Sequence, residues 1–175
     1  MRFMAATEHN LRSSQREAVL EHLFVGEVLR HLWLRDLTAE VLRPEVDDAG
    51  YDLVIECNSI VRHIQLKASH VGSTTARVPV NVRLEQKPSG CIIWIVFDKK
   101  TLDLCAFRWF GGDPGKPLPS LKGAAVAKHS KANAQGVKGE RPNIRILPKG
   151  SFTVVTDMSS LTQELFGRGV QDQPG

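Results

Sequence analysis

The segment from residue 50 to residue 69, GYDLVIECNSIVRHIQLKAS, constrains the fold more than any other part of the chain. Two apolar runs rich in β-branched residues, 51–57 and 60–68, flank the dipeptide Asn58-Ser59. Alternating apolar residues on either side of a two-residue turn are typical of a β-hairpin. If Cys57 pairs with Ile60, counting along both strands puts Asp52 directly opposite Gln65.

The predicted register gives the hairpin two different faces, because residues two apart in a strand point to the same side of a sheet. The apolar face consists of Leu53, Ile55, Cys57, Ile60, Ile64 and Leu66. The other face carries Asp52, Gln65 and Lys67. A carboxylate, an amide and an ammonium grouped in this way can hold a metal ion and a phosphate. The simpler interpretation is an exposed polar face.

These residues resemble the signature of the PD-(D/E)XK, or restriction-endonuclease-like, nuclease superfamily. That signature places an acidic residue on one strand and D/E/Q-x-K on the next, which here are Asp52 and Gln65-Leu66-Lys67. Members of the superfamily usually add a glutamate from the preceding helix, and Glu27 matches that position. The resemblance covers residues 14–69 well and the later strands loosely.

The resemblance implies an α/β fold with a restriction-endonuclease-like core, in which a mixed central β-sheet is flanked by helices. It also implies a Mg²⁺-dependent endonuclease that hydrolyses nucleic-acid phosphodiester bonds, with Mn²⁺ able to substitute. Asp52, the Gln65 side-chain oxygen and the Leu66 backbone carbonyl would hold the ion, with Glu27 completing the site. Oxygen ligands suit this hard cation. Lys67 would hold the attacking water and stabilise charge on the phosphate.

Two departures from the signature leave other interpretations open. No proline precedes Asp52, and the neutral Gln65 replaces the commoner carboxylate. The first alternative is therefore a catalytically inactive nuclease-fold domain that binds nucleic acid or a protein partner. The second is a chance similarity, in which Asp52, Gln65 and Lys67 form a surface hydrogen-bond cluster on another α/β fold.

The N-terminal part of the chain predicts one long helix. Ser14-Gln15-Arg16-Glu17 is a capping-box pattern, so we expect a loose lead-in of about ten residues and a helix to about Leu34. Its predicted apolar stripe consists of Leu20, Leu23, Phe24, Glu27, His31 and Leu34. A buried carboxylate on that stripe needs a partner, and the candidates for Glu27 are a metal ion, His31 and an arginine. Glu21 is the substitute for Glu27, and Asp48, in an acidic loop, is a second candidate ligand.

The rest of the sequence predicts strands around a single domain of residues 1–175. The expected strands are 38–42, 78–84, 91–97, 102–110, 143–147 and 152–156. Pro79 favours an edge position for the second of these. The run 91–97 is apolar throughout, as in a strand buried on both faces, and pairs with 102–110 as a hairpin. Asp157 caps a final helix, 158–166, which Gly167 ends.

Charge is unevenly distributed along the chain. Residues 1–70 carry 8 Lys/Arg and 11 Asp/Glu, residues 71–150 carry 14 and 5, and residues 151–175 carry 1 and 3, giving −3, +9 and −2. The middle segment is suited to a polyanion such as nucleic acid, although a basic run is often a solvated surface. We expect 121–150 to contact phosphates and to be partly flexible until nucleic acid binds. The predicted nucleic-acid-binding residues are Ser69, His70, Lys122, Lys128, Lys131, Lys138 and Arg141.

Composition narrows the class of protein further. No apolar run approaches the roughly 20 residues that span a bilayer, and the N-terminus lacks a signal-peptide core. The three cysteines lack the spacing of a zinc site and lie in apolar runs. We therefore expect them to be small buried side chains in a protein of a reducing compartment. We therefore expect a cytoplasmic protein with no membrane partner. Its partner is nucleic acid, DNA rather than RNA, and a homodimer or a partner protein can supply specificity.

Overall fold

The computed structural model describes residues 2–46, 49–131, 136 and 138–167. The elements follow one another in this order: helix α1 (Arg2–Trp33), strands β1 (Ala39–Leu42), β2 (Leu53–Cys57), β3 (Ile60–His70) and β4 (Arg77–Asn81), the 3₁₀ helix η1 (Val82–Gln86), strands β5 (Gly90–Phe97), β6 (Leu104–Gly111), β7 (Ala125–Lys128) and β8 (Glu140–Pro148), the 3₁₀ helix η2 (Lys149–Ser151), strand β9 (Thr153–Val155) and helix α2 (Met158–Phe166).

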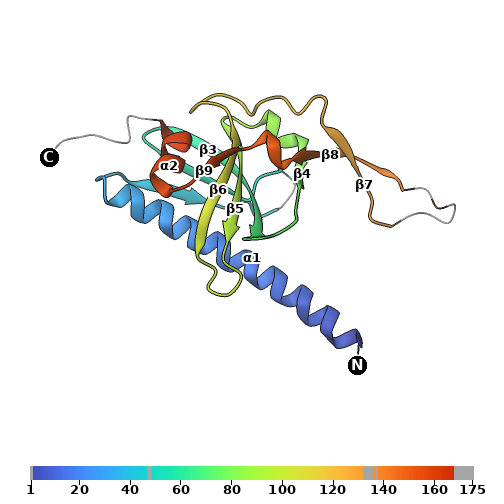
Figure 1. The fold of residues 1–175 in the computed structure, drawn as a ribbon. Helices are drawn as coiled ribbons and strands as arrows, with labels where there is room; N and C mark the ends of the chain where they lie inside the picture. The colour runs from blue at the N-terminus through green and yellow to red at the C-terminus, as the bar shows by residue number, and fades with distance from the viewer. Residues whose placement is uncertain (1, 47–48, 132–135, 137, 168–175) are drawn as a thin grey trace.

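The strands form two sheets (Figure 1). The larger has the order β1-β2-β3-β5-β6-β9, with β3 and β5 parallel and the other neighbours antiparallel. The smaller has the order β4-β8-β7 and is antiparallel throughout. The prediction of a mixed central sheet with helices is therefore confirmed. Among the residues described, no helix is long and apolar enough to cross a membrane.

The central hairpin has the predicted register. Cys57 pairs with Ile60 and Leu53 with Ile64. Both turn residues have positive φ, 50° at Asn58 and 62° at Ser59, as a two-residue turn matched to the strand twist requires. Gly50 has φ +82°, and a Cβ there would lie 3.0 Å from the Asn81 Cβ, so glycine is needed just before Asp52.

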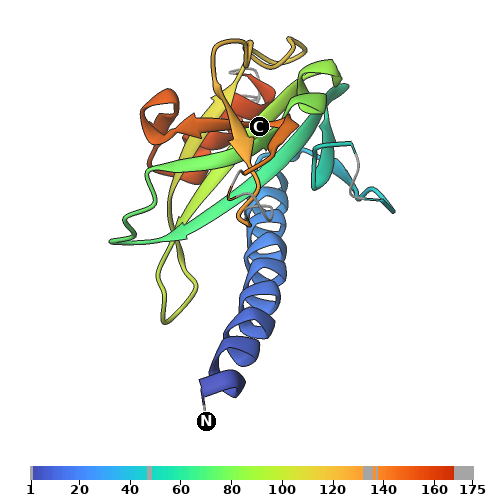
Figure 2. The ribbon, with the colours of Figure 1, turned by 90° about the vertical axis from the view of Figure 1, so that its right-hand side faces the viewer.

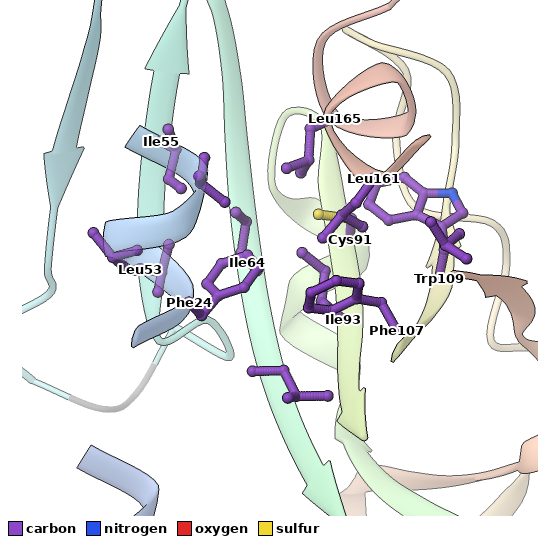
Figure 3. Close-up of a cluster of buried hydrophobic side chains, with 14 of the residues drawn as sticks. Phe24, Leu53, Ile55, Ile64, Cys91, Ile93, Phe107, Trp109, Leu161 and Leu165 are labelled. Atoms are coloured by element: carbon purple, nitrogen blue, oxygen red, sulfur yellow. The ribbon is translucent and has the colours of Figure 1, made fainter. Parts of the chain in front are cut away.

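The large sheet has a hydrophobic core on each face, and β5 contributes to both. Cys91, Ile93 and Ile95 point to the core shared with the two helices. Figure 3 shows Phe24 of α1 and Leu161 of α2 in this cluster. Ile92 and Trp94 point to the opposite core, which β4, η1 and the loop after β6 cover. The prediction that residues 91–97 form a strand buried on both faces is thus confirmed.

Helix α1 differs from the prediction in its start and in its buried face. It begins at Arg2, so the capping-box pattern at Ser14 lies inside the helix and the predicted lead-in is helical. Its N-terminal half projects beyond the sheet (Figures 1 and 2). The fully buried side chains of the helix are Leu20, Phe24, Val28 and Leu32. Leu23 and Leu34 of the predicted stripe are 41% and 68% exposed. Apolar residues on both sides of the helix made the sequence pattern ambiguous.

Most of the remaining predicted elements are present with small shifts. Pro79 lies on β4, an edge strand as expected, but of the smaller sheet. The chain leaves this strand at Asn81, whose Oδ1 accepts a hydrogen bond from Arg83 N at 3.0 Å and starts η1 in place of more strand. Helix α2 has the predicted bounds, with Asp157 as its N-cap. Strand β7 was not predicted, and Cys105, expected to be buried, is exposed.

A buried arginine joins the central hairpin to the end of α2. Arg62 lies on the apolar face of β3 and is 0% exposed. Its Nε donates to Leu165 O and its Nη2 to Glu164 O, both at 2.6 Å, and Nη2 also reaches Gly112 O at 3.0 Å. Its guanidinium carbon lies 5.2 Å from the centroid of the Trp109 ring. Burial lowers the pKa of Arg62, against the weaker opposing influence of Cys91 and nearby carboxylates.

Candidate active site

The candidate site lies where β2 begins and β3 continues with β5 as its neighbour on one side only. Asp52, just before β2, donates from its backbone N–H to Ile64 O at 2.8 Å. Its Oδ2 accepts from Leu66 N at 2.5 Å. The carboxylate oxygen therefore accepts the hydrogen bond that a backbone carbonyl would accept if the β2–β3 pairing continued. Beyond this point β3 runs on to His70 after its pairing with β2 has ended, so this edge of the strand is open.

A cleft of about 600 Å³ opens at this edge. Its lining comes from α1 (Glu17, Ala18, Leu20, Glu21), from the large sheet and the residue before β2 (Asp52, Leu66, Lys67, Ala68, Ile95) and from β4 and the loop before it (Thr75, Arg77, Val78, Pro79). The structure thus places Asp52, Leu66 and Lys67 together, as the sequence predicts. Carboxylates of α1 and cations of β3 and β4 share the same cleft.

Gln65 follows Ile64, the last residue of β3 that is paired with β2, and its environment differs from that of Asp52. Its side chain does not line the cleft and is only 8% exposed. Its Oε1 is buried without a hydrogen-bond partner. A buried polar atom without a partner costs about 1–3 kcal/mol, so it needs an explanation. An oxygen donor for a cation would have this environment before the ion binds.

The backbone carbonyl of Leu66 is the third predicted oxygen donor. In an extended strand the N–H and C=O of one residue point to the same side of the strand. Leu66 N–H points to Asp52, so its carbonyl also points to the open edge of β3. Asp52, Gln65 and the Leu66 carbonyl are therefore the predicted oxygen donors in this region, and Asp52 is the charged one.

Glu27 does not belong to this cleft. Its Oε2 lies 2.8 Å from Arg30 Nη2, and its side chain is 43% exposed. It lines a separate hollow with Asp103 and Asp157. The placement predicted from the sequence is therefore wrong, and the alternative that an arginine pairs with Glu27 is correct. The physical reason is helix geometry, because Glu27 is six residues beyond Glu21 and so points to a different side of α1.

The cleft carboxylates of α1 are Glu21, the predicted substitute, and Glu17, which sequence reasoning missed. They are four residues apart and so lie on one side of the helix. Glu21 Oε1 accepts from Arg43 Nε at 2.7 Å, and its side chain is 24% exposed. The spacing of Glu17 and Glu21 was visible in the sequence. Arg77 was also missed, because nothing local predicts that β4 passes in front of Lys67.

The predicted nucleic-acid-binding residues lie outside the cleft lining. Ser69 Oγ accepts from Trp94 Nε1 at 2.9 Å, on the side away from the helices. His70 Nδ1 is 2.8 Å from Val71 O, and its ring contacts Phe97 edge-on. The predicted basic residues are all exposed: Lys122, Lys128, Lys131, Lys138 and Arg141. Asp48 and the flexibility expected at 132–135 and 137 lie outside the described residues.

Two further findings bear on function. Within the described ranges, no group of three or more His, Cys, Asp or Glu side chains is arranged to hold a metal ion. No protein-family model and no curated protein matches the sequence. The geometry of the cleft is therefore the observation that bears most directly on function.

Proposed function

We propose that the protein is a metal-dependent nuclease that hydrolyses phosphodiester bonds in nucleic acid. The observation that carries this proposal is that Asp52, Leu66 and Lys67 line one cleft. The neighbouring Gln65 adds a buried side-chain oxygen that has no hydrogen-bond partner. Carboxylate, amide and carbonyl oxygens are ligands that Mg²⁺ accepts. A cation next to them is the group that phosphate chemistry requires.

The topology also supports the proposal. A helix comes first, three antiparallel strands follow, and the next strand of the large sheet is parallel to the third. This order puts the acidic residue and the Q-x-K segment on neighbouring strands and leaves one face of the sheet to the helix. It is compatible with the restriction-endonuclease-like core that the sequence resembles.

In this proposal the residues have separate roles. Asp52, Gln65 and the Leu66 carbonyl would hold Mg²⁺, and Glu21 would take the position first assigned to Glu27. The ion, when bound, acidifies a water molecule and offsets the charge of the phosphate. Lys67 would orient that water and stabilise negative charge on the phosphate oxygens. Arg77, on the opposite wall, would hold the substrate backbone in the cleft.

The test is a cleavage assay on duplex DNA, single-stranded DNA and RNA with Mg²⁺, Mn²⁺ or EDTA. We expect cation-dependent cleavage that Lys67→Ala lowers by about 10²–10³-fold, the usual cost of losing one charge-stabilising donor. Asp52→Asn should also abolish activity while keeping the hydrogen bond from Leu66 N. Lys116→Ala is the matched control, since Lys116 is exposed and outside the cleft. Equal rates for wild type and Lys67→Ala would refute the proposal.

A second candidate function is an inactive nuclease-fold domain that binds nucleic acid or a protein partner. One observation favours it: the strand part of the site has a single carboxylate, and in the described structure no group of three or more His, Cys, Asp or Glu side chains is arranged to hold a metal ion. It predicts binding without cleavage in any cation. It also predicts that Mg²⁺ leaves the melting temperature unchanged, because nothing in the folded state binds the ion preferentially.

A further inference from the structure

The smaller sheet extends into a two-stranded ribbon. Strand β4 pairs with β8 from Ile144 to Pro148, so the first residues of β8 continue beyond the end of β4. There the neighbour of β8 is β7, with Ala127 opposite Arg141, and His129 N donates to Gly139 O at 2.8 Å. Figure 1 shows this ribbon, formed by β7 and the start of β8, projecting from the body of the protein.

The ribbon is basic and poor in aromatic side chains. The described residues 125–131 and 138–148 include five Lys/Arg, one acidic residue, Glu140, and no Phe, Trp or Tyr, and their one aromatic ring is that of His129. Its described cations are Lys128, Lys131, Lys138, Arg141 and Arg145, of which the first four are exposed. Two-stranded ribbons have little stability of their own, and these side chains add nothing to either core. Their chemistry suits a polyanion.

We infer that this ribbon enters the major groove of B-form duplex DNA. Paired strands lie about 4.8 Å apart, and a two-stranded ribbon fits the undeformed major groove, which is about 12 Å wide. The minor groove, about 6 Å wide, admits strands only when the duplex is bent and the groove is opened. The major groove of duplex RNA is deep and narrow and excludes such an element. Proteins that bind single strands stack successive bases on several aromatic rings, and the described ribbon has only the imidazole of His129.

The ribbon is connected to the cleft through one strand. Arg77, on the cleft wall, pairs with Pro148 at the far end of β8, and Lys149 N donates to Ala76 O at 2.8 Å. A duplex held by the ribbon is therefore held in a fixed relation to Lys67 and Asp52. The inference rests on the proposed function only in naming duplex DNA as the substrate of the cleft.

The test measures binding of the whole protein in EDTA, where no cation-dependent step takes place. Fluorescence anisotropy compares duplex DNA, duplex RNA of the same sequence and the single DNA strand. The ribbon variant carries Lys128→Ala, Lys138→Ala and Arg141→Ala. The matched control carries Lys99→Ala, Lys100→Ala and Lys116→Ala, which remove three exposed cations elsewhere. Circular dichroism checks that both variants are folded.

We expect the ribbon variant to weaken duplex DNA binding and the control to leave it unchanged. Three lost phosphate contacts lower the log–log salt slope by about 2.7, so wild type should lose about 40-fold more affinity than the variant between 50 and 200 mM salt. A minor-groove ligand such as distamycin should not displace the protein. Glucosylated 5-hydroxymethylcytosine, which fills the major groove, should weaken binding.

Other outcomes overturn the inference. Equal losses on duplex DNA and duplex RNA, losses confined to the single strand, or displacement by distamycin would each exclude the major groove. A ribbon variant that binds like the control would leave the ribbon as a solvated surface. Failure of the proposed function is separate: a protein that binds duplex DNA through the ribbon but never cleaves with Mg²⁺ refutes the nuclease and not the ribbon.

Discussion

Replacing Arg62 with methionine tests what holds α2 on the sheet. The guanidinium is fully buried between β3 and the last turn of α2, where helix carbonyls lack partners within the helix. The hydrogen-bond partners of Arg62 are the backbone carbonyls of Leu165, Glu164 and Gly112. Methionine keeps the unbranched apolar stem of arginine to about the position of Nε, so the change removes the guanidinium with its charge and its hydrogen bonds.

The magnitude follows from two opposing contributions. Three hydrogen bonds from a charged donor are lost, each contributing about 1.5–3 kcal/mol, or roughly 4.5–9 kcal/mol together. Removing a buried charge returns several kcal/mol of desolvation, which offsets about half of that loss. We expect Arg62→Met to lower the free energy of unfolding by about 2–4 kcal/mol. For a chain of this length that corresponds to a fall of roughly 5–15 °C in the melting temperature.

Thermal melting measures the overall loss, and amide hydrogen exchange locates it. Exchange in α2 should become faster than exchange in β5, because α2 loses its attachment while the sheet keeps its core. Arg12→Met, at an exposed position of α1, is the control and should change neither quantity. A melting temperature of Arg62→Met equal to or above that of wild type would refute the reasoning, since desolvation would then outweigh the hydrogen bonds.

The remaining predictions concern the site, a helix cap and one glycine. Glu21→Gln should reduce the rise in melting temperature caused by Mg²⁺, whereas Glu27→Gln should keep the full rise, because Glu21 lines the cleft and Glu27 does not. Gln65→Glu should tighten Mg²⁺ binding in calorimetric titration, and unchanged affinity would remove Gln65 from the site. Asp157→Ala should lower stability by about 1 kcal/mol through loss of the cap to Ser160 N. That bond lowers the pKa of Asp157, so its stabilisation is present above about pH 4 and is lost as the pH falls through the lowered pKa, which melting across pH checks. Gly90→Ala should lower the melting temperature, since its Cβ would lie 2.6 Å from Leu84 O.

Local patterns were sufficient to predict the hairpin and the strands around it. Alternation determined which residues share a face, and the turn determined the register, so the pairs from Cys57–Ile60 to Leu53–Ile64 were predicted correctly. The same register put Arg62 on the apolar face, but its partners at Glu164 and Leu165 are a hundred residues away. No local pattern reports such a contact.

The helix side of the site was harder to predict for a physical reason. With apolar residues on more than one side of α1, the 3.6-residue period allows more than one buried stripe. Packing selects Leu20, Phe24 and Val28, and this turns Glu21 to the cleft and Glu27 away from it. The opposite wall of the cleft forms because β4 joins a second sheet, and this depends on tertiary contacts that no local pattern reports.

The pairing of β4 with β8 has a consequence for synthesis of the protein. Arg77 and Pro148 are partners separated by 71 residues of chain. At roughly 5–20 residues per second, about 4–14 s pass on the ribosome between the two. During that interval β4 has no neighbouring strand to pair with, and the wall of the cleft that carries Arg77 cannot yet form. The cleft is therefore assembled late, after the hairpin that supplies Asp52 and Lys67 has already left the ribosome.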